Sequence, residues 1–488
     1  MFVFQESQLD QLLETTITSM NPQRSPTQKP VPANVLFLGA RYAHYHASSE
    51  LLATLLNSAM VKINTKVERH QWDMTVLAFW ISNATLLLHY LRKDTGLVQV
   101  TTEFQLQLVE LINEIFILII RDAERRMDKV LDVAMLDHET IPGFEDVHFA
   151  NDWNIFRSKN KVQPLEAQGL RPQASNKRVQ PSPRNITSLL SSTLFVLDLY
   201  DIHSVITSQI LAQLFYWIGA ELFNHILCNK TYLARTKAMQ IRMNVSTLED
   251  WARANNRTPE HYENGLLTTS GESTVDAARK HLTPVVQLLQ WLQCFSSLGE
   301  DPEALDNTLR QLTRLTPQQL IHLSTNYRCE VGEKGMPKSA KKRLVALQSD
   351  ARKRRDQARR ERVFPSPQPD LTAESPHTPP QTPKQGSGDP PAMLSPASVY
   401  TPNGLDIRDE DEIEEEQFLM DPAHMLQFSL PTTVDLRISY GAGYGGLNRE
   451  RERRYIPTVP PEFLAKLDLS GRSSFVEKPE WNEHGLDD

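Results

Sequence analysis

The sequence predicts an all-α protein in which helical parts are joined by long segments expected to be disordered. From residue 35 to about residue 147, apolar side chains recur every three or four positions, and no useful length alternates as a β-strand does. A second helical pattern runs from residue 186 to about residue 327. The chain has 488 residues, but 31 prolines and a mean hydropathy of −0.42 indicate that part of it is not packed.

Charge and cysteine content narrow the classes of function. A formal net charge of −8 does not indicate a nucleic-acid-binding protein, and we expect no nucleic acid as a partner. The three cysteines lie far apart and form no CxxC pair, which argues against a disulfide framework and a thiolate zinc site. Residues 1–20 carry acids where a signal peptide needs basic residues. We therefore expect a cytoplasmic protein with no secretion signal.

Two apolar segments need to be tested as membrane spans. Residues 74–91 contain no charge and reach the minimum length for a spanning helix. They also contain Asn83 and His89, so we favour a buried core helix. Residues 104–120 are interrupted by two glutamates and an asparagine, and they too are expected to form a core helix.

Composition divides the chain into predicted segments. A proline-rich, polar linker at residues 151–185 separates helical subdomain I from helical subdomain II. Subdomain II opens with a long apolar stripe between Ile202 and Ile226 and ends in a basic helix. The predicted boundaries are 1–30 for an N-terminal flank, 31–150 for subdomain I, 186–357 for subdomain II, 358–416 for an insert, 417–465 for a C-terminal segment and 466–488 for a flexible tail.

Two helix starts carry explicit signals. Ser246 with Glu249 matches a capping box, in which the hydroxyl and the carboxylate each bond a backbone amide of the first turn. Thr316 with Gln319 repeats the pattern, and Pro317 between them suits the first helical position because its missing N–H costs nothing there. We therefore expect helices to begin at both places.

The insert at residues 358–416 is too rich in proline and acid to fold by itself. Several of its serines and threonines precede proline. They are candidates for proline-directed phosphorylation, although such pairs also arise from composition alone. These residues are Ser366, Ser375, Thr378, Thr382, Ser395 and Thr401.

No motif supports catalysis, a metal site or a cofactor. Gly441, Gly443 and Gly446 fit a GxGxxG pattern, but no apolar helix follows and no β-α-β unit surrounds them. His44 and His46 would point apart on a helix. The cluster Asp137, His138 and Glu139 precedes Pro142 and Gly143, so capping of a helix end is favoured over acid–base chemistry. An enzyme is the least favoured class.

A basic run within the predicted helix allows two interpretations. It attracts an anionic membrane, nucleic acid or an import receptor, or it is a solvated face balanced by the acidic run downstream. We slightly favour the second. The basic residues are Lys341, Lys342, Arg343, Arg352, Lys353, Arg354 and Arg355.

Specific stretches of sequence resemble a known family. The stretch LAQLFYWIGAELFNHIL, followed by KAMQIRMNVSTLEDW, resembles the dilute (DIL) domain, the core of the cargo-binding globular tail of class V myosins. The likeness extends over residues 31–343, and FLMDPAHMLQFSLP resembles the end of that tail. No P-loop, calmodulin-binding repeat or coiled-coil heptad accompanies it. The sequence therefore looks like a tail without its motor, as in fungal dilute domain-containing proteins.

The resemblance implies an elongated rod of two stacked helical bundles that binds adaptors, small GTPases or motor-associated proteins. From it we expect a non-enzymatic adaptor in vesicle or organelle traffic, located peripherally on Golgi or secretory vesicles. An afadin-like cortical scaffold is the alternative. Within KAMQIRMNVSTLEDW we expect the polar residues to fasten a bend between two helices. The residues that carry the family signature are Lys237, Met239, Gln240, Arg242, Asn244, Ser246, Glu249 and Trp251.

Overall fold

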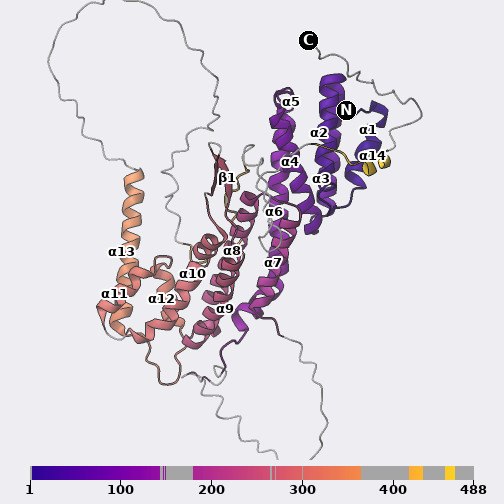
Figure 1. Ribbon diagram of the computed structural model, residues 1–488. Helices are drawn as coiled ribbons and strands as arrows, with labels where there is room; N and C mark the ends of the chain where they lie inside the picture. The colour runs from indigo at the N-terminus through magenta and orange to yellow at the C-terminus, as the bar shows by residue number, and fades with distance from the viewer. Residues whose placement is uncertain are drawn as a thin grey trace, which may run out of the picture. The chain divides into compact units, whose positions relative to one another are not determined.

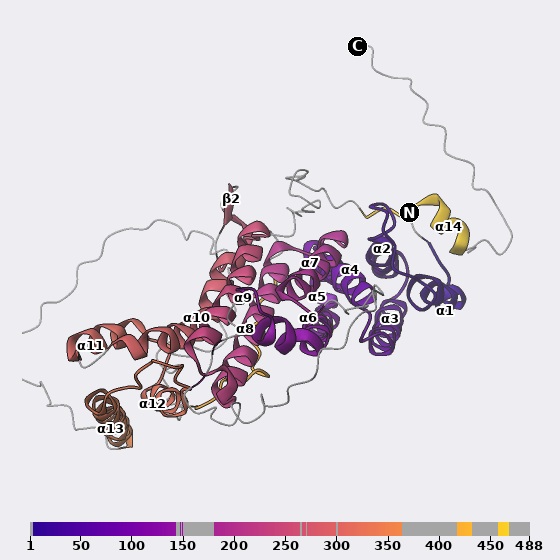
Figure 2. The same cartoon turned by 90° about the horizontal axis from the view of Figure 1, so that it is seen from below.

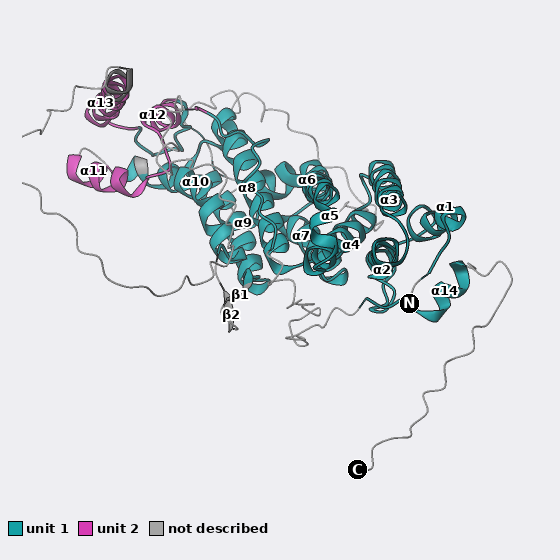
Figure 3. Ribbon diagram, turned by 90° about the horizontal axis from the view of Figure 1, so that it is seen from above, with its two compact units in different colours: residues 1–297, 326–335, 419–488 teal, residues 298–325, 336–418 magenta. Residues whose placement is uncertain are grey.

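The computed structural model describes residues 3–142, 147, 149, 180–263, 266–269, 271–298, 301–363, 417–431 and 457–467. Most of these residues are helical, which confirms the predicted all-α class (Figure 1). Within them a small antiparallel hairpin departs from that class, with β1 (Glu260–Glu263) paired to β2 (Leu266–Thr269). The helical periodicity of the sequence did not predict it. The chain divides into two compact units (Figure 3), which are Met1–Ser297 with Asn326–Gly335 and Leu419–Asp488, and Leu298–Thr325 with Met336–Phe418.

Unit 1 opens with helices whose starts follow the rules of capping. Ser48 accepts a hydrogen bond from the backbone of Leu51 at the start of α3, and Asp73 accepts two at the start of α4. The elements in order are η1 (Glu6–Gln8), α1 (Leu9–Leu13), η2 (Glu14–Thr18), α2 (Val31–His46), α3 (Ser49–Arg69), α4 (Met74–Lys93), α5 (Leu97–Val100), α6 (Thr102–Asp132) and η3 (Val133–Asp137).

The two most apolar helices lie in the core. Helices α4 and α8 (Ser204–Cys228) are long and apolar enough to cross a membrane, but 89% and 78% of their most apolar windows are buried inside the protein. The core helix predicted at residues 74–91 is therefore confirmed. Along α6, Glu110 and Glu114 are exposed while Ile112 and Ile115 are buried, which is the pattern of an amphipathic core helix.

In the second half of unit 1, α10 packs against both α8 and α9. Helices α8, α9 and α10 lie side by side in both views (Figures 1 and 2), and α6 contacts α7 and α8. The elements are α7 (Pro183–Leu199), α8, η6 (Lys230–Tyr232), α9 (Arg235–Ala254), α10 (Thr274–Cys294) and η7 (Phe295–Ser297). Helices from both sides of residues 151–185 thus pack within one unit, while the predicted subdomain boundaries stay a prediction.

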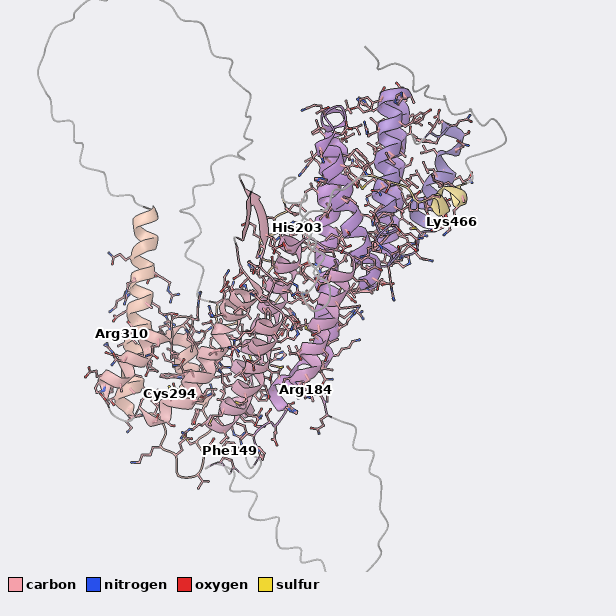
Figure 4. The ribbon with its side chains drawn as sticks, viewed as in Figure 1. Phe149, Arg184, His203, Cys294, Arg310 and Lys466 are labelled. Atoms are coloured by element: carbon pink, nitrogen blue, oxygen red, sulfur yellow. The ribbon has the colours of Figure 1, made fainter. Side chains whose placement is uncertain are left out.

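Two C-terminal segments pack on the helices of unit 1, to which they belong. Along α8, the amide side chains of Gln209, Gln213 and Asn224 each donate to and accept from the backbone of residues 420–429, at 2.8–2.9 Å. Helix α14 (Pro461–Leu467), which carries the Lys466 labelled in Figure 4, receives a hydrogen bond from Gln11 at the Leu467 carbonyl. The N-terminal and C-terminal ends of the described chain therefore meet in this unit.

Unit 2 contains α11 (Pro302–Gln311), most of α12 (Pro317–Asn326) and α13 (Lys338–Val363). The capping box predicted for α12 is confirmed, because Thr316 and Gln319 exchange backbone and side-chain hydrogen bonds of 2.9 and 3.2 Å. The basic helix α13 continues to Val363, beyond the predicted end at residue 357. Its Arg343 pairs with Asp306 of α11 at 3.1 Å.

The closest approach of α8 and α10 gives a testable prediction. A Cβ atom added to Gly219 would lie 2.3 Å from the backbone oxygen of His281. Replacing glycine by alanine within a helix gains about 1 kcal/mol of propensity, but forcing two backbones apart costs roughly 1–3 kcal/mol or more. We therefore expect Gly219→Ala to lower the free energy of unfolding, measured by urea denaturation.

The matched control is Gly39→Ala in α2. There the added Cβ atom meets only side-chain atoms, the nearer being Leu55 Cδ2 at 3.2 Å, which can shift. We expect this variant to be close to wild type in stability. Equal stability of the two variants would contradict the proposed tight crossing.

Candidate functional site

The candidate site is helix α9, which carries the family signature, together with the two loops that hold it. Helix α9 begins at Arg235 without a side-chain cap from its own N-cap residue, Ala234. A carboxylate distant in sequence takes that role, since Glu330 Oε1 accepts the backbone N–H of Thr236 at 2.8 Å. An acid at a helix N-terminus also interacts favourably with the helix dipole.

The loop at residues 326–335 is held rigidly enough to place Glu330. Glu333 accepts hydrogen bonds from the hydroxyls of Ser296 at 2.6 Å and Tyr327 at 2.8 Å, and its other oxygen accepts the N–H of Glu330 at 3.1 Å. Burial, together with the Glu333 carboxylate, raises the pKa of Tyr327, so the phenol remains a donor. The loop also places Arg328 3.8 Å from the ring of Phe149, which Figure 4 labels.

The second loop, at residues 138–141, is bound by two buried amides of α9. Asn244 donates to the carbonyls of Met135 at 3.0 Å and His138 at 2.9 Å, and it accepts from the Thr140 hydroxyl at 2.7 Å. Gln240 accepts the N–H of Ile141 at 2.9 Å. Both amide side chains are almost fully buried. We call this set of contacts the amide clamp.

The remaining signature residues correct one prediction. Ser246 does not cap a helix, because α9 runs without interruption from Arg235 to Ala254, and the Ser246 hydroxyl donates to Met243 O within the helix. Glu249 instead pairs with Arg242 at 3.1 Å. The predicted capping box and the predicted bend are therefore wrong. A serine at this spacing bonds equally well to a preceding carbonyl inside a helix, so the pattern alone is ambiguous.

Other signature residues tie α9 to its neighbours or face outward. Trp251 is buried and donates to the hydroxyl of Ser191 on α7 at 2.7 Å, and Lys237 pairs with Glu139 at 3.4 Å. Met239 and Met243, one turn apart, leave 37% and 48% of their surface exposed. Helical spacing sets charged Arg242 beside them on the same side of α9. We call Met239 and Met243 the methionine face. It is the part of the signature that does not hold the helices together.

The predicted chemical candidates do not form a catalytic or metal site. His44 packs against Tyr45 and His46 against Tyr42 on α2, without converging on a third ligand. Asp137 accepts from Tyr232 at 3.0 Å, Glu139 pairs with Lys237, and His138 contributes its carbonyl to the amide clamp. The described part of the chain contains no group of three or more histidine, cysteine or acidic residues placed to hold a metal.

Several predicted positions lie outside the described residues. These are the glycines of the GxGxxG pattern and the candidate phosphorylation sites, namely Gly441, Gly443, Gly446, Ser366, Ser375, Thr378, Thr382, Ser395 and Thr401.

One titratable cluster lies between α6 and α8 and was missed from the sequence. His225 places Nδ1 2.6 Å from Asp132 and Nε2 3.4 Å from Glu221. Nearby, burial raises the pKa of Glu124 from 4.5 to about 7, opposed by Arg121 and reinforced by Glu221. The residues on α6 lie 89–104 positions from those on α8 in the sequence, so no local pattern joins the two sets.

The comparisons with known proteins identify the family. The DIL domain family matches residues 209–331, from within α8 to the loop that caps α9. The chain is 34% identical over 356 residues to a dilute domain-containing protein of Schizosaccharomyces pombe, covering 72% of this chain and 60% of that relative. The chain contains a DIL domain. The resemblance stated from the sequence is confirmed.

Further comparisons agree with this assignment. The DIL protein is 27% identical over 321 residues to human unconventional myosin-Va, covering 60% of this chain and 15% of the myosin. The apo structure of Myo2-GTD matches with a TM-score of 0.50 and 16% identity, over 80% of this chain and 94% of that one. The chain thus shares the fold of a myosin V globular tail, while it spans less than two thirds of the length of its curated relatives.

The amide clamp of the DIL domain gives a prediction about stability. Asn244→Ala removes three buried hydrogen bonds and leaves the carbonyls of Met135 and His138 without this donor. Leaving such groups unpaired costs about 1–3 kcal/mol each, so we expect a loss of roughly 2–4 kcal/mol in the free energy of unfolding. Ser246→Ala is the control, because that half-buried hydroxyl bonds only within its own helix. If denaturant unfolding shows equal losses, the clamp is not the cause.

The raised pKa of Glu124 predicts a dependence of stability on pH. The unfolded chain releases this proton near pH 4.5 and the folded chain near pH 7. Between these values the folded state holds more protons, so stability falls as pH rises and is lowest above pH 7. Glu124→Gln should therefore raise the free energy of unfolding by roughly 1–3 kcal/mol at pH 8 and have little effect at pH 4.5. Urea denaturation at both pH values checks this, and a gain that is equal at both would contradict it.

Proposed function

We propose that this chain is a non-enzymatic adaptor that binds protein partners in vesicle or organelle traffic. The observation that carries the proposal is its DIL domain within a chain that shares the fold of the Myo2 globular tail. The 488 residues contain no P-loop that would supply motor activity. A fold of this kind suits a protein that links partners.

The use of polar groups in the DIL domain also favours binding over catalysis. The amides of Gln240 and Asn244 and the carboxylates of Glu330 and Glu333 all fix loops or helix ends. Catalysis requires a nucleophile, base or metal that converges on a reacting atom, whereas these groups bind backbone groups and, at Glu333, the hydroxyls of Ser296 and Tyr327. We therefore infer that the polar residues of the signature stabilise the fold.

We place the principal partner contact on the methionine face of α9. Methionine is unbranched and polarisable, so it adapts to partner surfaces of different shape. Met239 and Met243 are exposed one turn apart, and Arg242 beside them supplies a charged rim. An apolar centre with a polar rim is the usual arrangement of a protein interface.

The binding test compares two double variants of the full chain. Met239→Ser with Met243→Ser removes the methionine face, while Val61→Ser with Leu106→Ser removes two side chains that are 65% and 61% exposed elsewhere. Affinity purification from the native cell, with quantitative mass spectrometry, measures the recovery of small GTPases, adaptors and motor-associated proteins. We expect the first variant to lose at least about tenfold in recovery, as loss of a central interface pair predicts, and the second to match wild type.

Equal recovery by both variants would place the partner contact elsewhere. Recovery of no trafficking partner by the wild-type chain would contradict the function itself.

The proposal also includes a location, which is the cytoplasmic surface of Golgi or secretory vesicles. Live-cell imaging of the tagged chain tests it separately. Puncta that coincide with Golgi or secretory markers would support vesicle traffic, whereas a continuous rim at the cell cortex would favour an afadin-like scaffold.

A further inference from the structure

Helix α13 in unit 2 carries a basic face that its own unit does not neutralise. One edge packs inward, since Leu344 is buried, and Arg343 pairs with Asp306. The other side exposes four basic residues that helical spacing places on one face. They are Lys341, Lys342, Arg352 and Lys353.

Few carboxylates lie close to this face. Within the described residues, Lys353 has a weak partner in Asp350 at 3.8 Å, and no ion pair to another described residue involves Lys341, Lys342 or Arg352. The exposed large apolar residue of α13 is Val345. Because the apolar edge is turned inward, the helix has no broad apolar face to insert into a bilayer. The face therefore suits a polyanion bound by charge.

The chain itself supplies a polyanion that is tethered to the same unit. Residues 409–412 and 414–416 are all aspartate or glutamate. Two positions further on, Phe418 is held on α12, where Gln319 donates to its carbonyl at 2.9 Å and its ring lies 5.0 Å from the ring of His322. The residue that follows the acidic run by two positions is thus held within unit 2.

Chain length permits contact along the whole basic face. Residues 406–416 reach up to about 36 Å when extended, and the stretch of α13 from Lys341 to Lys353 is about 18 Å long. A tether this short gives an effective concentration in the millimolar range, so even a weak charge attraction is occupied most of the time.

We propose that the acidic run at residues 406–416 docks on the basic face of α13 in the same chain. It covers Lys341, Lys342, Arg352 and Lys353, and an outside polyanion such as an anionic membrane must displace it. The basic face then has two states. It is either balanced by the acidic run or bound to an outside polyanion, which are the two interpretations that the sequence allowed. This inference does not depend on which partner binds α9.

The direct test uses a carbodiimide, which joins a lysine amine to a carboxylate as an amide without a spacer, so the two groups must come into contact. An equal mixture of isotopically heavy and light full-length chains is treated at low salt and analysed by mass spectrometry. We expect links from Lys341, Lys342 or Lys353 to residues 409–416 within single chains. The links should disappear at 1 M salt, where the Debye length is about 3 Å. The pair Lys237 and Glu139, 3.4 Å apart, is the internal control.

Two results would overturn the proposal. One is formation of the control link with no link from α13 to the acidic run. The other is links only between heavy and light chains, which would assign the basic face to a second copy of the protein.

A protection experiment tests the same contact without lysine chemistry. The quadruple variant Asp409→Asn, Glu410→Gln, Asp411→Asn and Glu412→Gln weakens the polyanion and should increase the rate of tryptic cleavage within residues 341–353 by about threefold or more, because cleavage follows the uncovered population. The matched control makes the same change of charge at exposed acids of α6. It consists of Glu103→Gln, Glu110→Gln, Glu114→Gln and Asp128→Asn.

Cleavage that is unchanged in the first variant, or equally faster in both, would overturn the proposal.

Discussion

The structure of the DIL domain depends on the buried amide of Asn244. It connects the end of the α6–η3 segment to the middle of α9 through two carbonyls, at 3.0 and 2.9 Å. A buried carbonyl that loses its partner costs more than the hydrogen bond gains, so this amide fixes the position of a segment that no helix hydrogen bond can hold. Helix α9 is then tied to α7 through Trp251 and to the loop at residues 326–335 through Glu330. The residues of the family signature therefore serve mainly to join helices to one another.

Sequence reasoning predicted those features that arise within a single helix. The apolar period located α4, α6 and α8, and the pattern at Thr316 and Gln319 located the start of α12, because periodicity and capping act over a few residues. The same capping rule failed at Ser246, where packing along the whole of α9 continues the helix. Local propensity is a weak prior when tertiary contacts act on both sides of a residue.

Contacts between distant segments could not be predicted in this way. Glu330 caps a helix that begins about a hundred residues earlier, and the acidic cluster around His225 joins two helices, α6 and α8, that lie far apart in the sequence. The close crossing at Gly219 depends on the path of α10, which the sequence of α8 does not contain. Gln240 and Asn244 were correctly expected to hold a neighbouring segment by hydrogen bonds. The expected segment, a bend between two helices next to them in the sequence, was wrong, because they bind residues about a hundred positions earlier.

The contacts between α8 and residues 420–429 constrain the amino-acid sequences of these two segments to different degrees. Gln209, Gln213 and Asn224 each satisfy both a backbone N–H and a backbone carbonyl of residues 420–429, at 2.8–2.9 Å. Every residue except proline offers those same two groups. These backbone contacts therefore tolerate a change of side chain in residues 420–429, whereas α8 cannot exchange an amide for a carboxylate without losing a donor. The rings of Phe428 and His424 add side-chain contacts, with centroids 4.1 Å from Phe116 and 5.5 Å from Tyr216, so this segment is constrained by side chain at those two positions and by its backbone at the positions that bond the amides of α8.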